Sequence, residues 1–403
     1  MGYVAVRAHH AEIGGTRPGS FPPDARVLAE EGVVLAPFLA MRAGSFDLAG
    51  CRARFADAPF PSRNPDENIA DLLAQIAATR HGVTQMHALA TELGAAFPAR
   101  CAGELDRADR ALRAKLRSWP EREVHAQRQL DDGSVIRLRV KRVDDRLQID
   151  FSGSAPVHRG NFNAPRAVTQ AATLYALRLF IDRDVPMNEG LLRAVDLIVP
   201  EGMLNPSFSA DPTRCPPVVA GNVETSQSVV ATLVEAFAIA AESQSTMNNV
   251  LFGDATFGVY ETLGGGAGAG LGLDGASAVH VHMSNTRLTD VDVLERRAPV
   301  VIRRFEMRPH SGGNGAQHGG NGLIRSYQFL RPVSLSFFGS RRKFAPQGLD
   351  GGQPGACATQ QAVIGGIAID CSDAVLALEL GIGDQFTVQT PGGGGFGRAR
   401  FPD

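Results

Sequence analysis

Apolar residues recur every three or four positions in several stretches of the chain, which predicts amphipathic helices. The clearest stretch follows Asn64 and Pro65, which are a favoured capping residue and a favoured first-turn residue, and its apolar stripe covers residues 69–93. Gly82 interrupts this stripe and could bend or split the helix. Shorter helices are expected near residues 104–116, 165–181 and 223–241.

Alternation of apolar and polar residues predicts strands in other parts of the chain. Residues 123–151 alternate around the turn-forming pairs at 132–133 and 144–145, so we expect a β-meander there. Strand-like runs separated by glycine pairs fill the last third, and residues 3–6 and 277–283 also resemble strands. The predicted fold class is mixed α and β: a large multi-part unit with several amphipathic helices in its N-terminal and middle parts and a β-rich C-terminal third.

Changes in composition divide the chain into four expected parts. They are an N-terminal extended or strand segment (1–63), helices followed by the meander (64–160), a helical and glycine-rich core region (161–295) and a β-rich C-terminal region (296–403). A strand that begins so near the first residue suggests that a preceding segment is missing or lies on another chain.

Charge and cysteine content restrict the function classes. Lys and Arg number 40 against 42 Asp and Glu, a net charge of −2 that argues against an electrostatically driven nucleic-acid binder. Five scattered cysteines without a CxxC pair are typical of reduced thiols in a cytoplasmic protein. The apolar run at 229–241 contains Glu235 and is shorter than the ~18 residues that a membrane span needs. We therefore expect a cytoplasmic protein that binds neither nucleic acid nor membrane.

The glycine-rich segment does not predict a nucleotide site. Residues 270–275 fit GxGxxG by letter, but a strand-like run follows where a dinucleotide site requires a helix. Close packing or a mobile lid is the favoured interpretation. Because no Gly-Lys-Ser or Gly-Lys-Thr occurs, the chain has no phosphate loop of the Walker type, and ATP is not expected to bind to it through such a loop.

Two polar strings could carry chemistry. His280 and His282 are two residues apart and would share one face of a strand, so we expect both to face one polar cavity with Asn285 or Arg287. A hydrogen-bonded structural pair is the alternative. The string GNVETSQ at 221–227 opens an apolar helix and could bind an anionic or amide substrate, or simply cap the helix.

The first histidines form a further candidate. His9 and His10 are adjacent, so on a strand they would point to opposite faces and only one could enter a given site. We expect His9 to face an interior cavity with Glu12 nearby, and His10 to be secondary or structural. Carboxylate and imidazole groups often act together around metal ions.

Taken together, these strings resemble the hydantoinase B / oxoprolinase family, the B-type subunit of ATP-dependent hydantoinases and 5-oxoprolinases, which is related to acetone and acetophenone carboxylase subunits. The similar motifs run in family order over nearly the whole chain. They include RAHHAEIGGTRPGSFPPD, RNPDENIADLLAQIAA, GNFNAPRAVT, GNVETSQ, YETLGGGAGA, GASAVHVHMSNTRLTDVDVLE, SGGNGAQHGGNGLIR, RRKFAPQGLDGG and GDQFTVQTPGGGGFG.

The resemblance implies a division of labour between two subunits. An A-type, kinase-like partner would use ATP to phosphorylate the carbonyl of a small cyclic amide, and the B-type chain would then open the ring, so we expect a hetero-oligomer. A ketone carboxylase subunit, or an inactive truncated paralogue that only pairs with the A-type partner, are the alternatives. Substrate orientation or catalysis is expected from motif match and chemistry at the following positions: Asn285, Arg287, Asp290 and Glu12.

The resemblance also implies a divalent metal, Zn, Mn or Mg, in the intact family site. His9 matches a family metal ligand, and Glu12 stands where the family usually has Asp. His280 and His282 are second-tier candidates for the metal. The family's His-x-x-Asp pair should precede His9 and does not occur in this sequence, so we expect the isolated chain to hold metal weakly or not at all.

Overall fold

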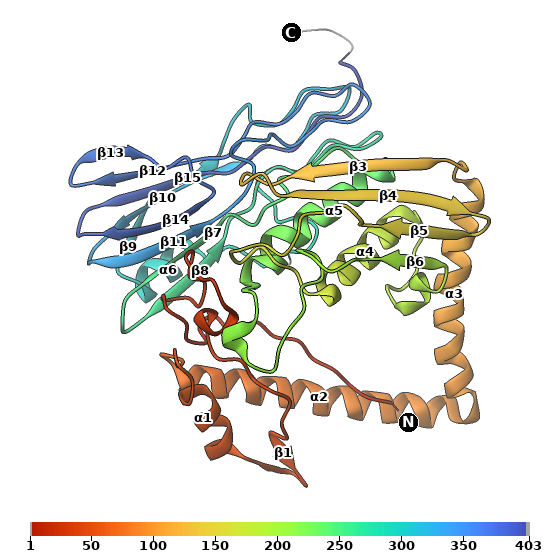
Figure 1. Ribbon diagram of the computed structural model, residues 1–403, viewed down its shortest axis with the longest axis horizontal. Helices are drawn as coiled ribbons and strands as arrows, with labels where there is room; N and C mark the ends of the chain where they lie inside the picture. The colour runs from red at the N-terminus through yellow and green to blue at the C-terminus, as the bar shows by residue number, and fades with distance from the viewer. Residues whose placement is uncertain (1, 285, 400–403) are drawn as a thin grey trace.

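The computed structural model describes residues 2–284 and 286–399 and contains helices in the N-terminal and middle parts and a β-rich C-terminal part (Figure 1). This arrangement confirms the predicted fold class. Short 3-10 turns connect several elements: η1 (Leu28–Glu31), η2 (Gly94–Ala96), η3 (Glu189–Leu192) and η4 (Pro212–Arg214).

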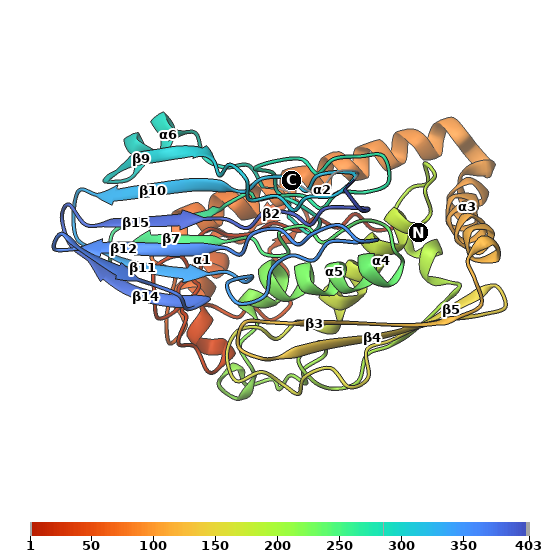
Figure 2. The same ribbon diagram turned by 90° about the horizontal axis from the view of Figure 1, so that it is seen from above.

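The predicted meander forms a four-stranded sheet in the order β3 (Glu123–Gln129), β4 (Val135–Val143), β5 (Arg146–Asp150) and β6 (Val195–Ile198). Gly133 (φ 94°) and Asp144 (φ 55°) adopt the left-handed backbone at the two expected turns, and β6 joins β5 in parallel. Two helices, α4 (Arg166–Phe180) and α5 (Ser226–Ala236), lie along this sheet, and α5 packs on β3 and β4 (Figure 2). Together they enclose the larger hydrophobic core.

The C-terminal part is a pair of antiparallel sheets that share a second core, in which Phe252 and Phe337 of one sheet meet Phe329 and Phe386 of the other. Helix α6 (Val291–Arg297) directly precedes β9 (Val300–Met307) along the chain. The five-stranded sheet consists of β13 (Ile367–Asp370), β12 (Thr359–Ile364), β15 (Gln385–Gln389), β10 (Leu323–Phe329) and β9 (Val300–Met307). The four-stranded sheet consists of β14 (Val375–Leu380), β11 (Val333–Phe338), β7 (Asn249–Gly253) and β8 (Gly258–Thr262). β6 pairs with β5 across the expected boundary near 160, and β7 pairs with β11 across the one near 295. The division into four parts stays a prediction.

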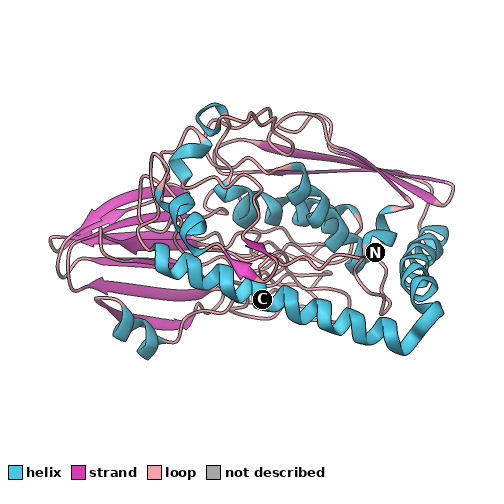
Figure 3. Cartoon of the chain, turned by 90° about the horizontal axis from the view of Figure 1, so that it is seen from below, coloured by secondary structure: helices cyan, strands magenta, loops and turns pink. Residues whose placement is uncertain are grey.

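The N-terminal part contains the hairpin β1 (Met41–Arg42) and β2 (Ser45–Phe46) and the helices α1 (Leu48–Ala56), α2 (Pro65–Leu93) and α3 (Phe97–Ser118). Helix α2 runs uninterrupted along the molecule (Figure 3). Its cap is the predicted one, because the Asn64 side chain accepts a hydrogen bond from the Glu67 amide. Gly82 does not split the helix; a Cβ atom there would lie 2.7 Å from Val4 Cγ1, so this glycine lets the N-terminal segment cross.

Two predicted strands are wrong within the described residues. Residues 3–6 form an irregular segment, and they pair with no strand that the structure describes. Residues 277–283 contribute only an isolated bridge between Gly265 and Val279, because Ala278 and His282 adopt positive φ angles of 53° and 54° that interrupt an extended backbone. At residues 3–6 the alternation does not reflect burial against a sheet, since Tyr3 is 91% and Val6 39% exposed.

The helix expected at 223–241 is shorter and begins differently. A single π-helical turn, η5 (Gly221–Thr225), leads into α5, and the positive φ of Ala238 (51°) follows its end at Ala236. No helix among the described residues is long and apolar enough to cross a membrane.

Glycine-rich segments at 264–275, 311–320, 347–355 and 391–397 pack on one another, and we call them the glycine bundle. Their backbones are hydrogen-bonded to each other and to Glu242: the amides of Gly393, Gly394 and Gly395 donate to Gly320 O, Glu242 O and Gln353 O at 2.8–2.9 Å. A Cβ atom on Gly393 would lie 2.0 Å from Ala267 O. Of the glycines at 270–275, only Gly275 is closely packed, since a Cβ atom there would lie 2.0 Å from Ala267 O. A Cβ atom on Gly270 would meet nothing closer than 3.8 Å and one on Gly272 nothing within 4 Å, so the prediction of close packing holds for Gly275 alone.

Candidate functional site

A cavity of about 370 Å³ lies where the N-terminal segment meets η1, η5 and β8. Its walls are mostly apolar, with a few polar side chains, which is the usual composition of a small-molecule site. The polar lining residues are His9, His10, Ser20, Glu31, Asn222 and Tyr260. Two family-like motifs, HHAEIGG and GNVETSQ, thus meet across 200 residues of sequence.

The first turns of α2 position the histidine segment. His10 Nδ1 lies 2.8 Å from Asp71 Oδ2, and the His10 ring packs edge-on against Phe55. Asn68 donates from its amide to the Glu12 carbonyl at 2.7 Å and accepts from Ser62 Oγ at 2.6 Å. The motif RNPDENIAD therefore serves both to start a helix and to fix the backbone next to the cavity.

Glu12 is buried, and its carboxylate is fully engaged. Its oxygens accept from the Gly14 amide, the Arg63 amide and the Arg63 guanidinium at 2.7–2.8 Å and from Ser62 Oγ at 3.1 Å. A carboxylate with this many donors holds the turn at residues 12–15 against the start of α2. These contacts favour a positioning role for Glu12, whereas the sequence suggested metal binding or catalysis.

Glu31 joins η1 to the opposite motif. Its carboxylate accepts from the Val218 and Val219 amides and from the Asn161 side chain at 2.8–3.2 Å. Burial raises the pKa of Glu31 to about 7, against the lowering effect of these donors. The group is thus able to change its protonation state near neutral pH.

The π-helical turn η5 is fixed by contacts with the segment that contains Phe162 and Asn163. A Cβ atom on Gly221 would lie 2.1 Å from Asn163 O, and Thr225 Oγ1 donates to Phe162 O at 2.6 Å. Buried Glu224 accepts from the Met247 amide and the Ser340 hydroxyl, and burial raises its pKa to about 7. Single π-helical turns occur frequently at functional sites.

Four of the six polar side chains on the cavity wall already have partners. Besides His10 and Glu31, Ser20 Oγ donates to Gly14 O at 2.7 Å, and the Tyr260 hydroxyl donates to Asn249 Oδ1 at 2.8 Å. Within residues 2–284 and 286–399, the side chains of His9 and Asn222 make no hydrogen bond or ion pair. These two groups are therefore available to a ligand. His9 is exposed and His10 is partly buried, and both line this cavity. The roles expected for the two histidines stay predictions.

The described residues do not form a metal centre. Among them, no group of three His, Cys, Asp or Glu side chains is placed to hold a metal ion. His9 offers one imidazole, while His10 is paired with Asp71 and Glu12 with Arg63. A catalytic zinc-type site needs three protein ligands. The residues present do not fit such a metal, so no chemical step is assigned to one.

The histidines of the second candidate string separate. His280 Nε2 lies 2.9 Å from Thr262 Oγ1, and together with Thr286 and Arg287 it lines a different cavity of about 490 Å³. His282 lies instead near Tyr175 on α4, and burial lowers the pKa of His282 to about 4. The expectation that both histidines face one cavity is therefore wrong, because the positive φ at His282 turns the backbone between them.

The remaining residues of that string have different roles. Asp290 caps α6 by accepting from the Asp292 and Val293 amides, and Arg287 is exposed at the rim of its cavity. Asn285 lies outside the described residues. The catalytic roles of Asn285, Arg287 and Asp290 stay predictions.

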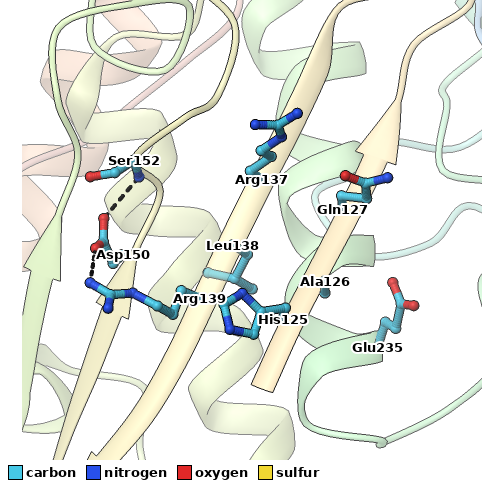
Figure 4. Close-up of a pocket in the computed structure, with 9 residues that line it drawn as sticks. All are labelled: His125, Ala126, Gln127, Arg137, Leu138, Arg139, Asp150, Ser152 and Glu235. Carbon is cyan, nitrogen blue, oxygen red and sulfur yellow. Dashed lines mark hydrogen bonds and ion pairs between the residues drawn. The ribbon is translucent and has the colours of Figure 1, made fainter. Parts of the chain in front are cut away.

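A groove of about 530 Å³ on the β3–β4–β5 sheet carries a third group of polar residues (Figure 4). Its charges are largely satisfied internally: Arg139 binds Asp150 at 2.6 Å, and the Ser152 amide donates to the same carboxylate at 2.8 Å. Since none of the predicted site residues lies here, the cavity beside His9 is the stronger candidate.

Sequence reasoning missed three residues of this cavity: Glu31, Tyr260 and Asn222 as an individual side chain. The motif GNVETSQ was recognised, but the π-helical turn that places Asn222 on the wall has no periodic signature. Glu31 follows an extended Gly- and Pro-rich segment, so only its charge in an apolar context could have drawn attention to it.

Comparison with known proteins relates the chain to 5-oxoprolinases of other organisms. It is 38% identical to 5-oxoprolinase 1 of Arabidopsis thaliana and 36% identical to 5-oxoprolinase of Dictyostelium discoideum, over 98% of this chain in both cases. It spans about a third of the length of these relatives, 33% and 31%.

Two solved structures share the fold. ATP-dependent caprolactamase from Pseudomonas jessenii superposes with a TM-score of 0.82 and 24% identity, covering 97% of this chain and 71% of that chain. Nucleotide-free acetone carboxylase superposes with a TM-score of 0.79 and 16% identity, covering 97% of this chain and 60% of that chain. The sequence model described as Hydantoinase B/oxoprolinase matches residues 1–399. The chain belongs to the hydantoinase B/oxoprolinase family.

Proposed function

We propose that this chain is the ring-opening part of an ATP-dependent cyclic-amide hydrolase of hydantoinase or 5-oxoprolinase type. Its partner would be an A-type, kinase-like subunit or domain that phosphorylates the ring carbonyl. The observation that carries this proposal is the cavity shared by HHAEIGG and GNVETSQ in a chain of this family. The 5-oxoprolinase names of its relatives agree with the same class of substrate.

The division of labour follows from the chemistry of amides. An amide carbonyl is a poor electrophile, and phosphorylation of its oxygen supplies a leaving group. The glycine-rich segments of this chain, which would be the natural place for a phosphate loop, are filled by one another's backbone. We therefore assign ATP to the partner, and ring opening to the cavity beside His9.

His9 is the proposed proton carrier of the ring-opening step. Water attacks the activated carbonyl carbon, and the His9 imidazole takes the proton that the water loses. As the bond between the carbonyl carbon and the ring nitrogen breaks, that proton passes to the nitrogen, which leaves as an amine. The phosphoryl group stays on the carbonyl oxygen as an acyl phosphate, and attack by a second water then releases the carboxylate and inorganic phosphate. The His9 imidazole has no hydrogen-bond or ion-pair partner among the described residues, so a ring nitrogen is open to accept a proton and to donate it again.

The experiment combines the purified chain with an A-type partner and ATP, and measures release of a primary amine or ureido acid from 2-pyrrolidinone, 5-oxoproline and hydantoin. We expect ATP-dependent opening of at least one ring. His9→Ala should slow the opening ~100-fold or more, the contribution typical of a general acid or base. The matched control, His81→Ala on the exposed face of α2, should leave the rate unchanged.

If none of these three rings is opened while the partner consumes ATP, the hydrolase proposal is contradicted. Carboxylation of acetone by bicarbonate in the same mixture would instead identify the ketone carboxylase alternative. Stable pairing with the partner but no turnover of any substrate would indicate the non-catalytic alternative.

A further inference from the structure

Asn222 lies on the wall of the cavity in a backbone that cannot easily move. It is the second residue of η5, between Gly221, which is pressed against Asn163 O, and Glu224, which is buried and hydrogen-bonded to the β7 segment and Ser340. A side chain on so fixed a turn loses little further freedom when it binds a ligand. It is thus preorganised for recognition.

The carboxamide of Asn222 is also free to bind. Of the cavity's polar side chains, only His9 and Asn222 lack a hydrogen bond or ion pair within the described residues. An amide group can donate twice and accept twice. The Asn222 side chain is only partly buried, so this capacity is open to a ligand that enters the cavity.

The matching ligand is a cis amide. Peptide-type amides in open chains are trans, so their N–H and C=O groups point in opposite directions. A ring of five or six atoms forces the amide to be cis, which places N–H and C=O on one edge. The side-chain amide of asparagine also presents a carbonyl and an N–H on one edge, so the two groups can form a pair of antiparallel hydrogen bonds.

We infer that Asn222 recognises the cis-amide edge of the substrate ring, accepting from the ring N–H and donating to the ring oxygen through the lone pair that this oxygen keeps after phosphorylation, and so selects cyclic amides that carry no substituent on the nitrogen. The inference rests on the proposed function and adds the residue that reads the substrate. Asn222 is a specificity-determining residue in this scheme, and the proton transfer stays with His9.

The rest of the cavity fits the hydrocarbon part of such a ring. Val168, Val218, Val219 and Val223 belong to its walls, and no Lys or Arg is among the lining residues that the structure describes. The volume of about 370 Å³ leaves room for one small ring with a substituent. Hydrogen bonding to the amide edge is therefore the main polar recognition that this wall offers.

The test measures binding of three neutral rings to the complete chain by calorimetry or ligand-observed NMR. The probes are 2-pyrrolidinone, N-methyl-2-pyrrolidinone and 5-methyl-2-pyrrolidinone. N-methylation removes the N–H group, and 5-methyl-2-pyrrolidinone adds the same methyl group but keeps the N–H. We expect the wild type to bind the two N–H rings about tenfold more tightly than the N-methyl ring, the discrimination that a lost hydrogen bond typically gives.

Asn222→Ala should reduce this ratio to about one, whereas Val168→Ala, which trims an apolar wall of the same cavity, should weaken all three rings alike and preserve the ratio. Circular dichroism and thermal unfolding show whether each variant is folded. Binding with an unchanged ratio in Asn222→Ala would overturn this inference and leave the proposed function standing. Failure of the wild type to bind any ring would overturn the cavity as the ring site, and with it both proposals.

Discussion

The glycine bundle and the N-terminal helices are stabilised by different kinds of contact. In the bundle, backbone packs on backbone: Cβ atoms on Gly266, Gly319 or Gly393 would lie 2.0 Å from a backbone oxygen. On α2, by contrast, only Asn68 and Ile69 are buried, and Met86 and Leu89 are 40% and 42% exposed. The glycine bundle packs closely because its glycines have no side chains, whereas helix α2 is held to the rest of the protein by a few buried side chains.

This difference teaches where each region can vary. The bundle glycines whose Cβ position is occupied by a neighbouring backbone, such as Gly266, Gly319 and Gly393, tolerate no added atom, because close-packed interiors relax only partially. The N-terminal region depends on specific polar anchors, such as Glu12 on Arg63 and Glu31 on the 218–219 amides. The cavity lies beside these anchors, so its shape depends on individual side chains and can be retuned by substitution.

The largest effect should come from Gly393→Ala. The new methyl group would meet Ala267 O and the Gly268 amide nitrogen, so either the bundle opens or the chain does not fold, at a cost of about 4 kcal/mol or more. Urea unfolding and soluble yield measure this. Gly270→Ala is the matched control, because a Cβ there meets nothing closer than 3.8 Å and its φ is not positive. Equal stability of both variants would contradict backbone closure of the bundle.

The same contrast explains what the sequence could predict. Helix α2, its Asn64 cap and the β3–β5 meander follow from periodicity and turn residues, because side chains determine them. The bundle has no side-chain pattern, and composition only indicates close packing. The motifs HHAEIGG and GNVETSQ allow part of the cavity wall to be predicted from the sequence. The contacts of Glu31 and Tyr260 do not follow from it, because they join residues that are distant in sequence. The separation of His280 and His282 depends on a positive φ that histidine rarely adopts.

The next largest effect is a pH dependence from Glu31. Burial raises its pKa from 4.5 to about 7, so the folded state holds a proton that the unfolded state has lost between these pH values. The contribution of Glu31 to stability is therefore most favourable below about pH 4.5 and falls by about 3 kcal/mol as the pH rises through 7. Glu31→Gln should flatten the curve of unfolding free energy against pH in this window.

Exposed Glu104 on α3 provides the control for this measurement, because Glu104→Gln should leave the slope of the wild type intact. If the slope of Glu31→Gln equals that of the wild type, the carboxyl group does not carry the proton, and the anchor at residues 218–219 is ionised throughout.

A smaller effect is expected where Glu12 holds the turn beside the cavity. Glu12→Gln leaves one of its donors, the Gly14 or Arg63 amide, facing an N–H group, at a cost of about 2 kcal/mol. Arg63→Met should cost less, since its guanidinium is partly exposed. A double-mutant cycle by urea unfolding should show coupling between the two residues. Additive costs would indicate that Glu12 does not act through Arg63.

The smallest effect should come from the outer part of α2. Its apolar stripe continues to Leu93, but burial ends near Ile69, which is 6% exposed. Ile69→Ala should therefore cost about 3 kcal/mol as a buried truncation, and Met86→Gln less than about 0.5 kcal/mol. Thermal unfolding of both variants, with sedimentation to monitor assembly, makes the comparison. A cost for Met86→Gln close to that of Ile69→Ala would mean that this face of α2 is covered in solution, and the contrast between a closed bundle and an open helix would then fail.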